Sequence, residues 1–212
     1  MTVDARLLTL TQWLSPSFPI GAFAYSHGLE SAIRDGWIED GADLQGWLHD
    51  ALTLGSARAD AIWLRLAVDS PDITQLDASA RAFAAASERV HEATRQGAAF
   101  ARTVQSVWGH EIPPLMLPVA VGRAVALAKL DPEAATLLYL QAFLTNLVTA
   151  AQRLMPLGQT AAQGILSRLT PTLCATATST AGCTLDDMSS TAFLFDIAAM
   201  RHETLQPRLF QS

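Results

Sequence analysis

The sequence predicts an all-α protein, a single-domain bundle of roughly ten helices. Apolar residues recur at three- and four-residue intervals along most of the 212 residues, which is the spacing of amphipathic helices. Strand signals are scarce, because no alternating β-branched run is bounded by turn residues. The length suits one large domain that buries a core without disulfides, and no internal repeat divides it.

The first half of the chain is expected to contain helices over 4–14, 22–35, 42–55, 56–70 and 76–108. In the first of these, Leu7, Leu10 and Leu14 share one face, Asp4 is placed to cap it, and Ser15-Pro16 ends it. Pro113-Pro114 makes a firm break after the last.

The second half is expected to contain helices over 118–130, 131–154, 160–169 and 189–201. The helix over 131–154 has Asp131 as N-cap and Pro132 in its first turn, and its apolar surface predicts the central core helix. Residues 172–184 fit either a weak helix or a mobile linker. The tail over 202–212 follows the last helix.

Composition narrows the class of protein. Half of the residues are apolar and 16% are charged, which fits either large partner interfaces or an apolar core. A net charge of −6 argues against a nucleic-acid partner. Cys174 and Cys183 are read as reduced thiols, and the most apolar stretch, 115–130, is too short and too charged to span a bilayer. We therefore expect a cytoplasmic protein with no membrane partner.

Catalytic and metal-binding patterns are weak. The five histidines form no pair at helical spacing, and there is no phosphate-binding loop and no GxSxG turn. His27 and Glu30 share a helix face, which fits half of a metal site or a hydrogen-bonded pair. Glu88, His91 and Arg95 are read as a solvated charge stripe. We expect no catalytic residue, no bound metal and no cofactor.

The segment SPSFPIGAFAYSHGLE, residues 15–30, combines aromatic side chains with two prolines and two glycines. Pro19 fixes φ and Gly21 permits a tight turn, so a rigid corner is predicted. Its aromatic side chains suit either interface anchors or core residues.

Three segments together resemble the UreF family of urease accessory proteins. They are the corner at 15–30, the block AAQRLMPLGQ at 150–159, and the tail RHETLQPRLFQS at 201–212. Their order and spacing match the family over essentially the whole chain. The Gln206-Pro207 pair departs from the family pattern and leaves the conformation of the tail open.

The resemblance implies a non-enzymatic, all-α homodimer. Such a protein works with UreD, also called UreH, and with UreG, a P-loop GTPase that carries nickel. Together they deliver nickel to the urease apoprotein, so nickel is handled transiently and GTP is bound by UreG. Two alternatives stay open: a metal-dependent hydrolase using His27, Glu30, His202 and Glu203, and a helical regulator that binds a small molecule.

We assign partner binding to side chains of the three segments. They are Tyr25, Ser26, His27, Glu30, Arg153, Gln159, His202, Glu203, Arg208, Leu209 and Phe210. Those of the corner are expected on or beside a functional surface, with Phe18 and Phe23 anchoring the corner behind them. The tail either folds back onto its own domain or docks onto UreD, and we favour docking.

Overall fold

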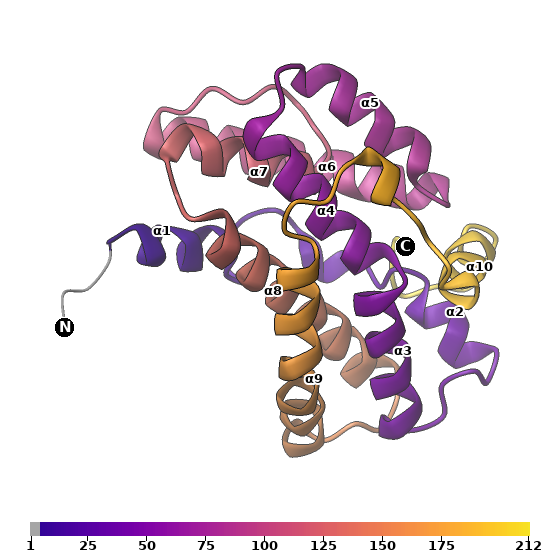
Figure 1. The fold of residues 1–212 in the computed structure, drawn as a ribbon. Helices are drawn as coiled ribbons and strands as arrows, with labels where there is room; N and C mark the ends of the chain where they lie inside the picture. Colours follow the sequence, from indigo (N-terminus) through magenta and orange to yellow (C-terminus); the bar gives the residue numbers. More distant parts are fainter. Residues whose placement is uncertain (1–4) are drawn as a thin grey trace.

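The computed structural model describes residues 5–212 and confirms the all-α class. These residues form ten α-helices and two 3-10 turns, with no strand among them (Figure 1). The elements are α1 (Ala5–Trp13), η1 (Ala22–Ala24), α2 (Leu29–Arg34), α3 (Gly41–Thr53), α4 (Ser56–Asp69), α5 (Ile73–Phe83), α6 (Ser87–Trp108), α7 (Leu117–Ala128), α8 (Pro132–Leu154), α9 (Gln159–Ser179), η2 (Leu185–Asp187) and α10 (Phe193–His202).

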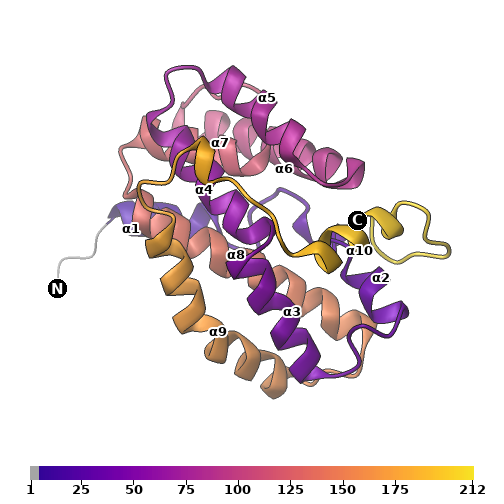
Figure 2. The ribbon, with the colours of Figure 1, turned by 45° about the vertical axis from the view of Figure 1, so that its right-hand side comes forward.

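The helices enclose two hydrophobic cores. One core lies among α2, α3, α9, α10 and the second half of α8, and the other among α1, α5, α6, α7 and the first turns of α8. Helix α4 contributes side chains to both. Figure 2 shows the arrangement, with α5, α6 and α7 on one side of α4, α3 and α9 on the other, and α2 and α10 at one edge. The boundary between the two cores is where the candidate site lies.

Helix α8 is the central helix, as predicted. The Asp131 side chain accepts a hydrogen bond from the Glu133 amide at 3.0 Å, Pro132 occupies the first turn, and Arg153 lies in the last turn. By length and composition α8 could cross a membrane, a test that the core helix of a soluble protein also passes. In this structure α8 contributes to both cores and contacts α9, α4 and α2.

Two predicted helices are wrong because each is divided. The helix expected over 22–35 is interrupted at His27 and Gly28, which have φ of 55° and 78°, a left-handed conformation that no α-helix can pass through. The helix expected over 76–108 is broken between Phe83 and Ser87, although its alanine content favours helix. Packing of α5 and α6 against α7 outweighs that propensity.

The region after the block at 150–159 is more helical than expected. Helix α9 continues from Gln159 to Ser179 through Pro171, so most of 172–184 is helix. Leu173 and Ala177 extend its buried face into the core, and the Thr176 hydroxyl donates to the Leu52 carbonyl at 3.1 Å. This packing offsets the cost of a proline within the helix. The cap predicted at Asp4 lies outside the described residues.

Candidate functional site

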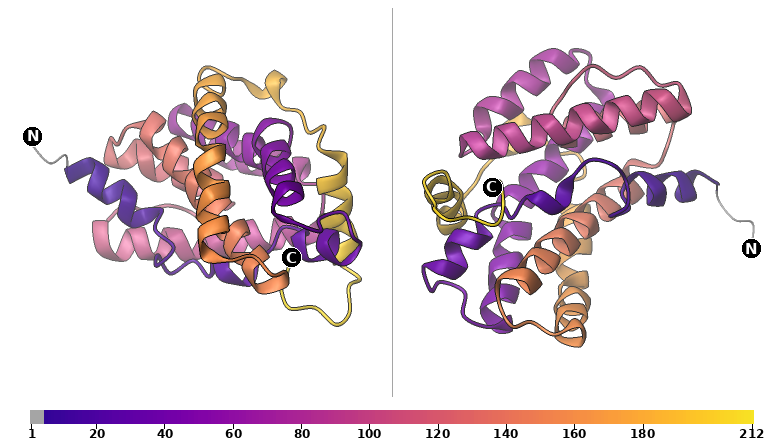
Figure 3. Two further views of the ribbon diagram at one scale, coloured as in Figure 1. Left: turned by 90° about the horizontal axis from the view of Figure 1, so that it is seen from below. Right: turned by 180° about the vertical axis from the view of Figure 1, so that it is seen from behind.

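The three singled-out segments meet at one place in the fold. Seen from behind, the end of the chain lies beside the segment that follows α1 (Figure 3). The Ser26 amide and hydroxyl both donate to the Ser212 main-chain oxygen, at 2.6 and 2.5 Å, and the Gln211 amide donates to the Ala24 carbonyl at 2.8 Å. Arg153 donates to the Phe23 carbonyl at 3.0 Å, and its guanidinium lies 4.4 Å from the centroid of the Phe210 ring. Corner, block and tail thus form one site.

Glu30, in the first turn of α2, holds the tail by its main chain. Its carboxylate accepts from the amides of Leu209 and Phe210 at 2.7 and 2.9 Å. The ring of His202 adds a contact, with Nε2 3.3 Å from Glu30 Oε2. Main-chain donors of a chain end are satisfied here by a side chain more than 170 residues away in sequence.

The start of α6 supplies a second attachment for the tail. Glu88 accepts from His202 Nδ1 at 2.8 Å and pairs with Arg208. The residue before α6 is Ala86, which offers no side-chain cap, and Glu203 takes that place by accepting from the Ser87 amide and hydroxyl, both at 2.8 Å. The bond from the Ser87 hydroxyl holds the pKa of Glu203 below its usual range. The tail therefore caps a helix of its own domain.

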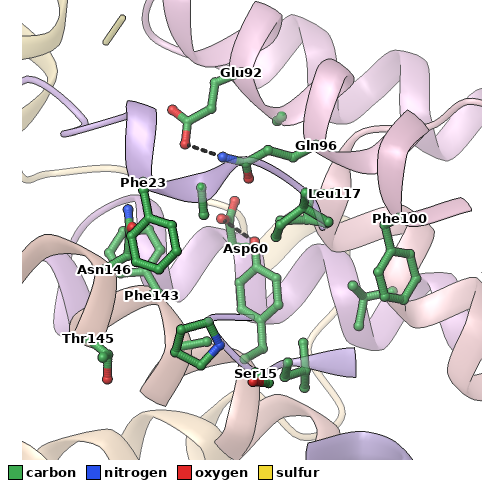
Figure 4. A pocket seen from close by; sticks show the side chains of 18 of the residues that line it. Ser15, Phe23, Asp60, Glu92, Gln96, Phe100, Leu117, Phe143, Thr145 and Asn146 are labelled. Carbon is green, nitrogen blue, oxygen red and sulfur yellow. Dashed lines mark hydrogen bonds between the residues drawn. The ribbon is translucent and has the colours of Figure 1, made fainter. Parts of the chain in front are cut away.

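A buried charged cluster lies beneath these contacts, formed by His27, Asp60, Arg89, Glu92 and Tyr139. The His27 Nε2 atom is 2.8 Å from Glu92 Oε1, and the Tyr139 hydroxyl donates to Asp60 at 2.8 Å. Arg89 pairs with Glu92 and lies 3.8 Å from Asp60, between the two carboxylates. Figure 4 shows two of the bonds around the cluster, from Gln96 to Glu92 and from Tyr139 to Asp60.

Burial and pairing set the charges of the cluster. Burial opposes ionisation of Glu92, but the charge of Arg89 and the bonds from His27 and the Ser212 hydroxyl outweigh it and bring its pKa to about 2. Burial and then the charge of Arg89 lower the pKa of His27, so its ring is neutral at pH 7. Burial raises the pKa of Asp60, and the nearby Arg89 charge acts against that rise.

Beside the cluster is a cavity of about 140 Å³. Aromatic and aliphatic side chains from α1, α6, α7 and α8 form most of its wall, and the charged cluster forms one end. In Figure 4, Phe23, Asn146 and Thr145 lie on one side of the cavity, with Leu117 and Phe100 opposite. We call this space the central cavity.

Most of the corner side chains are buried, so they can lie beside a functional surface but do not themselves form one. Ser26 and His27 are 0% and 6% exposed, and Tyr25 is also buried. Ser26 donates to the tail, Nε2 of His27 lies against Glu92, and the Tyr25 carbonyl accepts from Asn146. Glu30 is half-buried against the tail.

The two corner phenylalanines differ in position. Phe18 is buried against Phe100 and Trp108 and anchors the corner as expected. Phe23 is 51% exposed at the rim of the central cavity, so its predicted anchoring role is wrong.

In the block and tail the assigned residues divide into two groups. His202 and Phe210 are buried, at 0% and 3% exposed. The exposed residues are Arg153, Gln159, Glu203, Arg208 and Leu209. These exposed residues are the assigned partner-binding residues that a partner protein can contact.

Sequence reasoning missed the contribution of α6 and α4 to the site. Glu88, Arg89 and Glu92 share one face of α6, and Glu88 is held by the tail instead of lying in a solvated stripe. His91 and Arg95 are exposed, as that interpretation required. The spacing of Glu88 and Glu92 was visible in the sequence, but nothing local indicates that Asp60 and Tyr139 lie opposite them.

The histidines do not assemble a metal-binding set within residues 5–212, where no group of three or more His, Cys, Asp or Glu side chains could hold an ion. Of the four residues of the hydrolase alternative, His202 and Glu30 meet. His27 instead pairs with Glu92, and Glu203 binds Ser87.

Comparison with known proteins gives one consistent result. The sequence model of the UreF family matches residues 38–170. Proteins named "Urease accessory protein UreF" are similar over nearly the whole chain. That of Cereibacter sphaeroides is 48% identical over 99% of this chain and 100% of its own length. That of Roseobacter denitrificans is 45% identical over 100% and 96%, and that of Jannaschia sp. is 41% identical over 97% and 94%.

Proposed function

The chain belongs to the UreF family of urease accessory proteins, and we propose that it is a non-catalytic scaffold of urease maturation. In this proposal it forms a cytoplasmic complex with UreD (UreH) and the GTPase UreG that delivers nickel to the urease apoprotein. Nickel is the cargo of the complex, and GTP is bound by UreG.

The observation that carries this proposal is the convergence of the three family segments on the tail. Their polar side chains are engaged in holding the chain end, as in Glu30 with Leu209 and Phe210. Polar groups that are engaged in this way fix the conformation of a surface. They do not form a pair of free nucleophile and base in contact. A scaffold uses such a surface to select partners.

We infer that the exposed side of the folded tail is the face offered to UreD. Leu209 is exposed there beside Arg208, and the preceding α10 leaves Phe193, Leu194, Ile197 and Met200 exposed on its surface. An apolar surface of this kind with charged neighbours has the composition of a protein interface. Docking on this face does not require the tail to leave its own domain.

The test is co-expression with UreD and UreG, followed by sizing of the complex with and without GTP and nickel. Leu209→Asp should abolish co-purification of UreD while leaving the melting temperature unchanged, because Leu209 is exposed. Val107→Asp on α6, at a comparably exposed position, is the matched control. Full complex formation by Leu209→Asp would refute the docking face, and turnover by the isolated chain would refute the scaffold.

A homodimer is the second element of the proposal. A two-fold interface is self-complementary and presents two equivalent sites to UreG. Light scattering at micromolar concentration should give twice the chain mass of 22.7 kDa. A monomer both alone and with UreD would contradict it.

A further inference from the structure

We propose that the central cavity is a binding site for a small neutral molecule that joins an aromatic ring to one hydroxyl group, with phenol as the simplest member of the class. This site is independent of the scaffold role. It lies between the two cores, bounded by the corner, α6, α7 and α8.

The size and walls of the cavity select a single ring. Its volume of about 140 Å³ is close to that of cavities of about 150 Å³ known to hold benzene. Trp13, Phe100, Val121 and Phe143 contribute apolar and aromatic surface. These walls offer an aromatic ring close dispersion contacts over most of its surface.

The polar end of the cavity disfavours a charged ligand. Arg89 pairs with Glu92 and lies 3.8 Å from Asp60, Gln96 donates to Glu92, and Tyr139 donates to Asp60, so each charged group already has a partner. A ligand ion would arrive without a free counter-charge and would lose its hydration. Neutral molecules avoid that cost.

Two buried polar atoms of the cavity wall favour a ligand with a hydrogen-bonding group. The indole nitrogen of Trp13 and Nδ1 of His27 have no hydrogen-bond partner among the described residues, and both residues line the cavity. An indole N–H can only donate. Nε2 of His27 lies 2.8 Å from Glu92 Oε1 and 3.0 Å from Arg89 Nη1, so Nδ1 of the neutral ring accepts when Nε2 donates to Glu92 and donates when Nε2 accepts from Arg89. A hydroxyl group offers both functions on one atom. Toluene, which lacks it, leaves both atoms unpaired.

The cavity is reachable from solvent. Pro16 and Phe23 are exposed at its rim, and Thr145 and Thr149 of α8 are half-buried there. A ligand can therefore exchange without unfolding of either core. Phe23 also accepts a bond from Arg153 through its carbonyl, so occupancy is expected to stabilise the corner.

The first experiment titrates the full chain with phenol and with toluene by calorimetry at pH 7. Phenol should bind one site with a dissociation constant of about 1 mM or tighter, and toluene about tenfold more weakly. Absence of saturable phenol binding would overturn the proposal, as would equal affinity for toluene.

The second experiment locates the ligand. Ala142→Leu places a larger side chain in the cavity and should weaken phenol about tenfold or more. Ala134→Leu, at another half-buried position of α8 outside the cavity lining, should leave the affinity unchanged. Should Ala142→Leu not fold, intermolecular NOEs from phenol to the methyl groups of Val121 in the unmodified chain decide. NOEs confined to exposed residues such as Phe193 would overturn the site.

Discussion

At the scale of single residues, two glutamates hold the last residues of the chain in different ways. Glu30 is half-buried and accepts from main-chain amides, whereas Glu92 is buried and accepts from the Ser212 hydroxyl at 2.9 Å. Glu92 is also paired with Arg89, so its charge stabilises the buried charged cluster as well as the tail. The two positions should respond differently to the same loss of charge.

Glu92→Gln should lower the free energy of unfolding at pH 7 by about 3–5 kcal/mol, because it leaves the buried Arg89 without its main partner. The pKa of Glu92 is about 2 in the folded chain against 4.5 in the unfolded one. Its contribution is therefore present above pH 4.5 and lost as pH falls toward 2. Urea unfolding at several pH values should show a weaker acid dependence in the variant than in the parent.

The control for this prediction is Glu111→Gln, since Glu111 is exposed. Because the pKa of His27 is lowered by folding, its contribution to the stability of the fold is lost as pH falls below 6.5. The pKa of Asp60 is raised by folding, so Asp60 makes the fold more stable as pH falls. Both groups remain in the variant, and because the Glu92 charge raises the pKa of both, the difference from the parent reports Glu92 together with its effect on them. An unchanged acid dependence in Glu92→Gln would contradict the assignment.

Glu30→Gln should release the tail without unfolding the domain. One amide oxygen cannot replace a carboxylate that accepts from both Leu209 and Phe210, and the loss is expected to be about 1–3 kcal/mol. Hydrogen exchange of these two amides should become faster, while exchange in α8 stays unchanged. Glu39→Gln, at an exposed position, is the control. Equal protection in both variants would show that Glu30 does not hold the tail.

At the scale of elements, the corner and α10 approach at Gly28. A Cβ atom at this position would lie 2.5 Å from the Ala199 main-chain nitrogen, and φ is +78°. Gly21 has a similar φ of +75° but nothing within 4 Å of an added Cβ. The pair therefore separates backbone strain from contact with α10.

Gly21→Ala should cost about 1–2 kcal/mol, which is the penalty of the left-handed conformation alone. Gly28→Ala should cost clearly more, because α10 must also move away from α2. Thermal unfolding of the two variants measures the difference. Equal losses would mean that the corner does not fix α10.

How far the sequence could predict these elements depends on whether their determinants are local. The start of α8 follows from Asp131 and Pro132, which act within one turn, and its prediction is confirmed. The break at His27 depends on bonds to Glu92 and on the approach to Ala199, which are remote in sequence. The alternation and helical periodicity of apolar residues carry no information about contacts between residues that are remote in sequence. The buried charged cluster was therefore not predictable.

At the scale of the whole molecule, the chain end joins the two cores. Phe210 belongs to the core of α2, α3 and α9, whereas Ser212 binds Glu92 of α6 beside the other core. The corner lies between them, with Phe18 in one core and Leu29 in the other. The contact between the two cores therefore depends on residues near both ends of the described chain.

Truncation after Leu205 tests that dependence, because it keeps α10 and His202 and removes Phe210 and Ser212. Loss of a buried phenylalanine costs about 3–5 kcal/mol, and each kcal/mol lowers the melting temperature of a chain this long by about 2–4 °C. We expect a fall of about 6 °C or more in the isolated protein. Arg208→Ala, at an exposed position, should change it little by comparison. An unchanged melting temperature after truncation would mean that the tail gains its order from a partner and contributes nothing to its own domain.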